Sequence, residues 1–232
     1  MSAAASPVDL DALLPSIEAA VAEGSKRLNA GYQGAVYLIE HDGRRLVIKA
    51  PTGHGLLRHV HLRLLRHEHR AYQRLVEVNG VPRCHGLAGG RFLVLDYVEG
   101  PNARDAQLTD RDVFYDRALA VIQAIHARGV AHADLKRRDN ILVGAGEQPL
   151  LLDFGLAVLR AEGFHPLNHW LFDLACRFDL NAWIKHKYRY REGEISETDG
   201  VYHRPLPFES AWRRIRRFVR APLRALRQAR GH

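Results

Sequence analysis

The sequence has few cysteines and no long apolar run. Its 232 residues include two cysteines, Cys84 and Cys176, which lie far apart and outside any metal-ligand spacing. This scarcity argues against a disulfide scaffold and favours a reduced, cytoplasmic protein. No segment is apolar enough to span a bilayer. The N-terminus carries Asp9, Asp11 and Glu18 and lacks a basic region followed by an apolar core, so we expect no signal peptide.

Acidic residues are absent from Ala211 to the end of the chain, where eight arginines gather. Their number equals the formal net charge of +8, so the rest of the chain is neutral. Apolar residues recur there at three- and four-residue steps, the pattern of an amphipathic helix. We interpret residues 211–232 as a basic helix that suits an anionic surface at the inner membrane face, with RNA as the alternative ligand. A final helix that packs on the body and leaves its arginines solvated explains the pattern equally well.

Two short apolar runs, residues 35–40 and 45–50, predict a β-hairpin. The segment between them contains Asp42-Gly43, and Asp-Gly between such runs is a strong hairpin signal. Gly31 and Gly34 precede the first strand, where glycine lets the backbone approach a ligand closely. For two glycines alone, an ordinary turn is the simpler interpretation.

Residues 56–78 have helical periodicity with one misplaced carboxylate. Glu68 lies on the apolar stripe, four residues from both Leu64 and Tyr72. A carboxylate that faces a core needs a cation beside it, and Lys49, which interrupts an apolar strand, is the nearest candidate. The alternative is that Glu68 reaches solvent at the edge of the helix. The histidines of this region have no zinc spacing, and we expect them to be solvated: His54, His59, His61, His67 and His69.

The second half of the chain is predicted to be mostly helical. Residues 91–100 indicate a strand that runs into an acidic connection between two lobes, and a helix over 109–128 follows. A helix pair is expected at 169–188, where Asp173 or Asp179 could brace the preceding charged loop from behind. For both carboxylates we favour the alternative, a solvated position on a helix.

Aliphatic runs at 141–143 and 150–153 predict a second hairpin. Antiparallel pairing brings the start of one arm beside the end of the other, so Asn140 and Asp153 meet. Their oxygens make half of a Mg²⁺ site, since Mg²⁺ takes a few protein ligands together with water and phosphates. Asp134, on the loop leading in, is placed to accept a proton from an attacking hydroxyl. Two lysines would offset charge on a transferring phosphoryl group: Lys49 and Lys136.

These features resemble the protein-kinase-like superfamily, whose signature motifs occur here in order. The matching segments are "NAGYQGAV", "LVIK", Glu68, "HADLKRRDN" and "DFG". The resemblance covers roughly residues 28–160. Because the motifs occur in order and at suitable separations, the match is specific.

The resemblance implies a role for each matching residue. Lys49 would hold the α- and β-phosphates of ATP, and Glu68 would fix Lys49. Asp134 would be the catalytic base, while Asn140 and Asp153 would hold Mg²⁺. Further ATP contacts would come from the phosphate loop and the junction between the lobes: Asn29, Gly31, Gly34, Val36, Asp96 and Val98.

Three departures from the family pattern have consequences. Asn29 replaces the first glycine of the phosphate loop. Ala133 replaces an arginine that commonly pairs with a phosphorylated activation loop, so we expect no control by such phosphorylation. The catalytic loop is one residue longer than the family pattern, because Asn140 stands six after Asp134. Asp139 is therefore the alternative metal ligand.

The resemblance implies an α+β, two-lobed protein-kinase-like fold with a small β-rich N-lobe and a short, mostly helical C-lobe. We expect an N-terminal helical extension, the N-lobe, a reduced C-lobe with the catalytic loop and DFG, and the basic C-terminal helix: 1–28, 29–95, 96–210 and 211–232. With no A-P-E motif and a short C-lobe, the chain resembles the compact lipopolysaccharide-core (Kdo and heptose) kinases and the RIO-type kinases.

The expected function is an ATP- and Mg²⁺-dependent transfer of the γ-phosphoryl group to a hydroxyl. We expect a lipopolysaccharide-core sugar as the acceptor, with a protein serine or threonine as the alternative. A different class of function is a nucleotide-binding pseudokinase that scaffolds a partner at the membrane or the ribosome. The retained charges of Lys49, Asp134 and Asp153 argue against that class.

Overall fold

The computed structural model describes most of the chain as two compact units. The described residues are 7–24, 27–31, 34–189 and 194–204. One unit consists of the described residues up to His69 together with Arg83–Tyr97, and the other of Arg70–Pro82 together with those from Val98 onward. The helix predicted for 211–232 lies outside the described residues.

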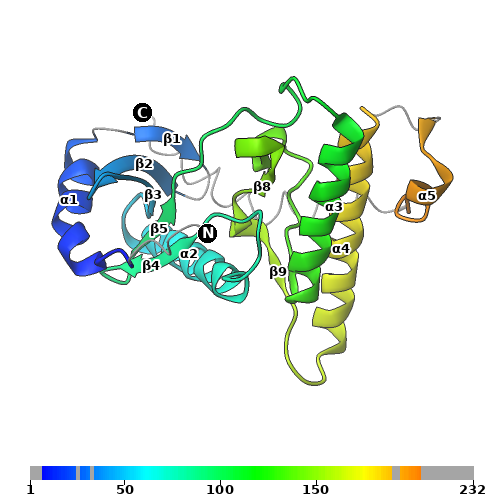
Figure 1. The fold of residues 1–232 in the computed structure, drawn as a ribbon. Coiled ribbons are helices and arrows are strands. Elements are labelled where there is room, and N and C mark those ends of the chain that lie inside the picture. The colour runs from blue at the N-terminus through cyan, green and yellow to red at the C-terminus, as the bar shows by residue number, and fades with distance from the viewer. Residues whose placement is uncertain (1–6, 25–26, 32–33, 190–193, 205–232) are drawn as a thin grey trace, which may run out of the picture. The chain divides into compact units, whose positions relative to one another are not determined.

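The first unit is built on an antiparallel sheet of five strands in the order β1-β2-β3-β5-β4 (Figure 1). Its elements are α1 (Leu10–Glu23), β1 (Arg27–Gly31), β2 (Gly34–His41), β3 (Arg44–Ala50), most of α2 (Gly55–Arg74), β4 (Cys84–Ala88) and β5 (Phe92–Asp96). The predicted hairpin is confirmed as β2 and β3. Asp42 and Gly43 at its turn have φ of 49° and 70°, the left-handed backbone that a two-residue hairpin loop requires.

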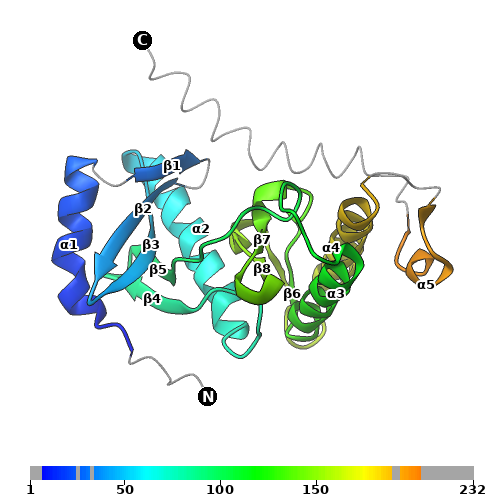
Figure 2. The ribbon, with the colours of Figure 1, turned by 45° about the horizontal axis from the view of Figure 1, so that its top comes forward.

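Helix α1 covers one face of this sheet (Figure 2). Asp9 caps its first turn by accepting from two backbone N–H groups, and Gly24 ends it with φ 66°. Alternate residues of the strands point to the same face of a sheet. Those that pack with Leu13 and Ile17 of α1 include Ala35, Tyr37, Ile39, Leu46, Ile48 and Ala50.

Helix α2 corresponds to the helix predicted at 56–78, although it ends at Arg74. One of its histidines corrects the prediction that all of them are solvated. His61 is buried, and its Nδ1 accepts from the backbone N–H of Thr52 at 3.2 Å. The buried imidazole therefore has a hydrogen-bond partner in the turn that precedes the helix.

The second unit is mostly helical, and the α+β class is confirmed. Its elements from the junction onward are α3 (Arg111–Ala127), β6 (Val130–Ala131), β7 (Ile141–Val143), β8 (Pro149–Leu151), β9 (Val158–Leu159), α4 (Pro166–Lys187) and α5 (Glu197–Gly200). Helices α3 and α4 lie side by side in both views (Figures 1 and 2). Strands β7 and β8 form the predicted second hairpin, with Ile141 opposite Leu151.

The helix pair predicted at 169–188 is wrong, because α4 is one continuous helix. Its sole proline, Pro166, stands in the first turn, where the missing N–H has no intrahelical acceptor, and the helix contains no glycine. No breaker is present to divide it. Within the described part of the chain, no helix is both long enough and apolar enough to cross a bilayer.

Candidate functional site

The first unit brings Lys49 and Glu68 together. The Nζ of Lys49 lies 2.6 Å from Oε1 of Glu68, whose side chain is 1% exposed. Lys49 stands opposite Val36 on β2 and Leu93 on β5, so it lies in the middle of the sheet. The alternative in which Glu68 reaches solvent is therefore wrong. A buried carboxylate bonded to an ammonium fixes the direction in which that ammonium points.

The predicted phosphate loop is the connection from β1 to β2. Asn29 and Gly31 lie in β1, opposite Val36 and Gly34. Gly34 has φ 133°, and a Cβ atom there would lie 2.3 Å from the carbonyl oxygen of Ala50. Glycine is therefore required at position 34 by the packing of the sheet itself, and this requirement holds with or without a ligand.

The residues predicted at the junction have different surroundings. Asp96 ends β5, and its Oδ1 lies 2.7 Å from Nε2 of His85. Its carboxylate is thus engaged within the first unit. Val98 is the first residue of the longer segment of the second unit and is half-buried. Their contacts with ATP remain predictions.

The second unit brings Asp134, Asn140 and Asp153 to one place. Asp134 and Asn140 are both buried, and the Nδ2 of Asn140 donates to the carbonyl oxygen of Asp134 at 2.9 Å. The backbone oxygen of Asn140 accepts from the N–H of Leu152 at 3.0 Å, which places the residue before Asp153 beside Asn140. Both metal-ligand candidates therefore lie at the same end of the β7–β8 hairpin.

Asp179 on α4 holds the catalytic loop, so the solvated position that we expected for it is wrong. Its side chain is 1% exposed and accepts from the backbone N–H groups of His132 and Ala133 at 2.7 and 2.8 Å. His126 lies 3.0 Å from the same carboxylate. Asp173, in contrast, is 62% exposed, as we expected. The brace is therefore Asp179, and the solvated interpretation holds for Asp173 alone.

His132 connects the catalytic loop to the DFG segment. Burial lowers the pKa of this imidazole and outweighs the nearby charge of Asp179, which would raise it. The neutral ring donates from Nε2 to the carbonyl oxygen of Leu152 at 2.8 Å, while Nδ1 accepts from the N–H of Asp134. Phe154 packs against the same ring and against Tyr72, with ring centroids 4.8 and 5.1 Å apart.

Two residues of this cluster have a left-handed backbone although neither is glycine. Ala133 has φ 60° and Asp153 has φ 67°. Each such residue costs about 1–3 kcal/mol and persists only where its surroundings enforce it. Asp179 accepts from the N–H of Ala133 and thereby supports the first of them. Strained positions of this kind concentrate at functional sites. Ala133 directly precedes the predicted base Asp134, and Asp153 is itself a predicted metal ligand.

The geometry favours Asn140 over Asp139 as a metal ligand. Asp139 is 64% exposed, and its carboxylate lies 3.7 Å from Nε of Arg138. The amide of Asn140 is buried, and its Oδ1 is the atom that could bind a cation. Lys136 lies on the exposed part of the loop. In the described residues no three His, Cys, Asp or Glu side chains form a metal cluster. One carboxylate and one amide suit Mg²⁺, which takes its remaining ligands from phosphates and water.

Comparison with known proteins gives partial matches to kinases. No family model matches the chain. The chain is 30% identical over 141 residues to CBL-interacting protein kinase 25 of Oryza sativa subsp. japonica, a match that covers 53% of this chain and 27% of that kinase. It is 30% identical over 160 residues to serine/threonine-protein kinase Pkn1 of Myxococcus xanthus, covering 62% of this chain and 22% of Pkn1.

The chain spans about a quarter of the length of these relatives. The closer resemblance to lipopolysaccharide-core and RIO-type kinases therefore stays a prediction. Over part of its length the chain is thus similar to protein kinases, and its α+β fold agrees with that similarity.

Proposed function

We propose that the chain is an ATP- and Mg²⁺-dependent phosphotransferase that moves the γ-phosphoryl group to a hydroxyl. The proposal rests on the buried cluster in which Asn140 is hydrogen-bonded to Asp134 and to Leu152, the residue before Asp153. Hydrogen bonds to Asp179 and His132 hold the loop of this cluster in place. A chain without chemistry has no need for a buried carboxylate, Asp134, close to two residues with a strained backbone, Ala133 and Asp153. By the resemblance to kinases, Lys49, which is paired with Glu68 in the first unit, would bind phosphate oxygens of ATP.

Each residue then has a part in the transfer. Asp153 and the Oδ1 of Asn140 would hold Mg²⁺, which offsets the charge of the β- and γ-phosphates. Lys49, aimed by Glu68, would pair with phosphate oxygens of ATP. Asp134 accepts the proton of the acceptor hydroxyl as its oxygen bonds to the γ-phosphorus. The bond from that phosphorus to the bridging oxygen breaks, and ADP leaves.

The acceptor is a hydroxyl of a protein or of a sugar. The name of the Myxococcus relative describes a serine/threonine-protein kinase, which supports a protein serine or threonine. A lipopolysaccharide-core sugar, which the resemblance to compact bacterial kinases implies, stays the alternative. Incubating the enzyme with labelled ATP and either a cell-protein extract or purified lipid A-core would separate these acceptors, because label enters only one of the two.

The test of the proposal is ATP turnover by the wild type and by Asp134→Asn. We expect turnover above the blank for the wild type and a rate near the blank for the variant. The scaffold alternative predicts another pattern, in which both rates equal the blank while Mg-ATP still raises the melting temperature. That pattern would overturn the proposed function.

A further inference from the structure

A small basic pocket lies in the second unit, apart from the residues assigned above. Its volume is about 250 Å³. It is lined by Arg104, Asp105, Arg111, Lys185, His186 and Arg189. Pockets for drug-sized ligands usually have about 300–1,000 Å³, so this one suits a single chemical group better than a whole nucleotide.

The charge of the lining is strongly positive. Four of its side chains are permanent cations and one is a carboxylate. Asp105 is itself paired, since Arg138 lies 3.7 Å away and the Nδ2 of Asn102 donates to it at 2.9 Å. Its charge is therefore partly offset from outside the pocket. Arg104 and Arg189 are exposed to solvent, where an incoming anion can reach them.

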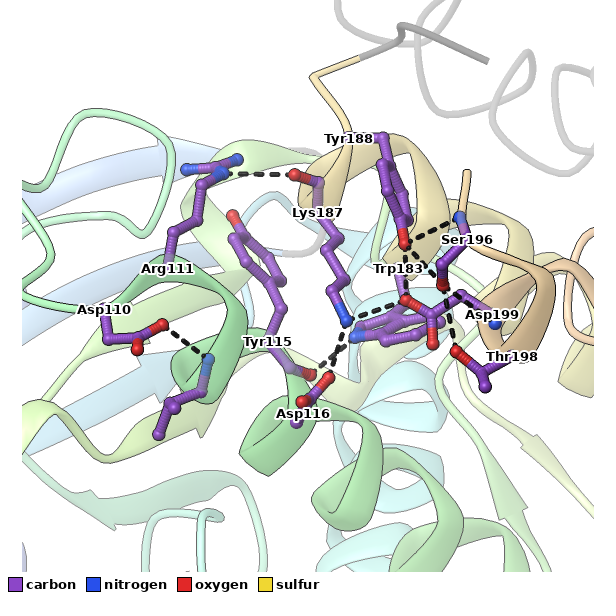
Figure 3. Close-up of polar contacts among 11 residues, drawn as sticks. Asp110, Arg111, Tyr115, Asp116, Trp183, Lys187, Tyr188, Ser196, Thr198 and Asp199 are labelled. Atoms are coloured by element: carbon purple, nitrogen blue, oxygen red, sulfur yellow. Dashed lines mark hydrogen bonds and ion pairs between the residues drawn. The ribbon is translucent and has the colours of Figure 1, made fainter. Parts of the chain in front are cut away.

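The wall of the pocket is held in place by hydrogen bonds. Arg111, at the start of α3, donates to the carbonyl oxygen of Lys187 at 3.1 Å (Figure 3). It also donates to the carbonyl oxygen of His186 and lies over the ring of Tyr115. These contacts join the end of α4 to the start of α3. The pocket is thus formed by fixed backbone, with the exposed arginines around it.

The charge of Lys187 is used elsewhere. Its Nζ lies 2.7 Å from the carboxylates of both Asp116 and Asp199 (Figure 3). Burial alone would lower the pKa of Lys187, but these two hydrogen-bonded carboxylates raise it to about 12. Lys187 thus stabilises the end of α4, and the positive charge of the pocket comes from its own lining.

Two contacts connect the pocket to the catalytic loop. His186 donates from Nε2 to the carbonyl oxygen of Leu135 at 2.8 Å, and Leu135 directly follows Asp134. Burial lowers the pKa of His186, and the positive charges of Arg104 and Arg111 lower it further. The second contact is the pair between Asp105 and Arg138, a residue of the same loop. The pocket therefore lies against the loop that carries the proposed base.

We propose that this pocket binds a phosphate group on the acceptor, so that the enzyme selects a peptide segment already phosphorylated near the hydroxyl it modifies. The inference rests on the proposed function. Arginine binds phosphate in a fork geometry with two parallel hydrogen bonds, and several arginines together match a doubly charged phosphate better than a single carboxylate. We choose a peptide as the acceptor because the relatives are protein kinases.

The experiment measures the binding of a short peptide that contains phosphoserine and a free serine, by fluorescence anisotropy. The variants are Arg104→Gln combined with Arg189→Gln, and the control Arg177→Gln, an exposed position of α4 outside the pocket. We expect about tenfold weaker binding for each pocket arginine removed and unchanged binding for the control. Equal binding by the double variant and the wild type would overturn the proposal.

Two further probes test the chemistry of the ligand. A peptide with glutamate in place of phosphoserine should bind at least about tenfold more weakly, and equal affinity would show that any acidic group suffices. Glucose 6-phosphate should compete less well than the phosphopeptide. Stronger competition by the sugar phosphate would overturn the choice of a peptide acceptor.

Failure of the pocket and failure of the proposed function can be told apart. Peptide binding is measured without turnover, and Asp134→Asn should bind the phosphopeptide as tightly as the wild type. If the wild type transfers no phosphoryl group but binding depends on Arg104 and Arg189, the proposed function fails and the phosphate pocket stands. If the wild type transfers a phosphoryl group but the double variant binds the phosphopeptide as tightly as the wild type, only the pocket proposal fails.

Discussion

The two units hold their charged residues by different means. In the first, Lys49 on strand β3 forms an ion pair with Glu68 on helix α2. In the second, Asp134 belongs to a network of backbone hydrogen bonds centred on Asp179 and His132. A single pair can be lost or replaced as a unit, whereas a network couples every member to the path of the loop. Substitutions in the two units should therefore differ in whether function and stability change together.

The largest effect is expected for the proposed base. Asp134→Asn keeps the size of the side chain and removes its ability to accept a proton, so the transfer rate should fall by about 10²–10⁴. The free energy of unfolding, measured by urea titration, should change by less than about 1 kcal/mol. A variant that loses stability and retains its rate would make Asp134 a structural residue.

Lys49→Met should destabilise the first unit by about 3–4 kcal/mol, because it leaves the buried carboxylate of Glu68 without its cation. Adding Glu68→Gln removes that charge, so the double variant should regain about half of the lost stability while transfer stays abolished. The measurement is urea unfolding of both variants. If adding Glu68→Gln lowers the free energy of unfolding further, the charge of Glu68 is not the cause of the destabilisation.

Asp179→Asn should cost about 2–3 kcal/mol and also slow transfer. An amide offers one acceptor oxygen in place of two, so one of the N–H groups of His132 and Ala133 would be left buried without a partner. The control is Asp173→Asn on the same helix, which should change stability by less than about 0.5 kcal/mol. If Asp179→Asn loses stability but transfers at the wild-type rate, Asp179 does not position the catalytic residues.

Acid should destabilise the second unit through its buried histidines. Burial lowers the pKa of both His132 and His186 from the usual value of 6.5. The unfolded chain then binds more protons, so stability is complete above about pH 6.5 and is lost as the pH falls. Each histidine should account for about 1 kcal/mol between pH 7 and pH 5.5.

The slope of stability against pH measures this effect. His186→Gln should reduce the slope, while His54→Gln, an exposed position of the first unit, should leave it unchanged. An equal slope for His186→Gln and the wild type would contradict the assignment.

Features with a local signal could be predicted from the sequence. The hairpin around Asp42-Gly43 follows from turn chemistry, and Glu68 was identified because it breaks an apolar stripe. Asp179 breaks the stripe of α4 in the same way, and this signal could have shown that it is buried.

Other features have no local signal. The pocket combines residues near position 104 with residues near 186, which only the folded second unit brings together. The left-handed backbone of Ala133 likewise depends on a carboxylate 46 residues away. Contacts between distant segments follow from packing, and a pattern read along one segment does not contain them.

We propose that Lys49 binds phosphate oxygens of ATP and that Asp153 holds the Mg²⁺ that accompanies ATP. Titration calorimetry with ATP and Mg²⁺ tests it most directly, using the wild type, Lys49→Met with Glu68→Gln, and Asp153→Asn. We expect one ATP per chain for the wild type and loss of Mg²⁺-dependent binding in both variants. Full Mg²⁺-dependent binding in either variant would contradict it.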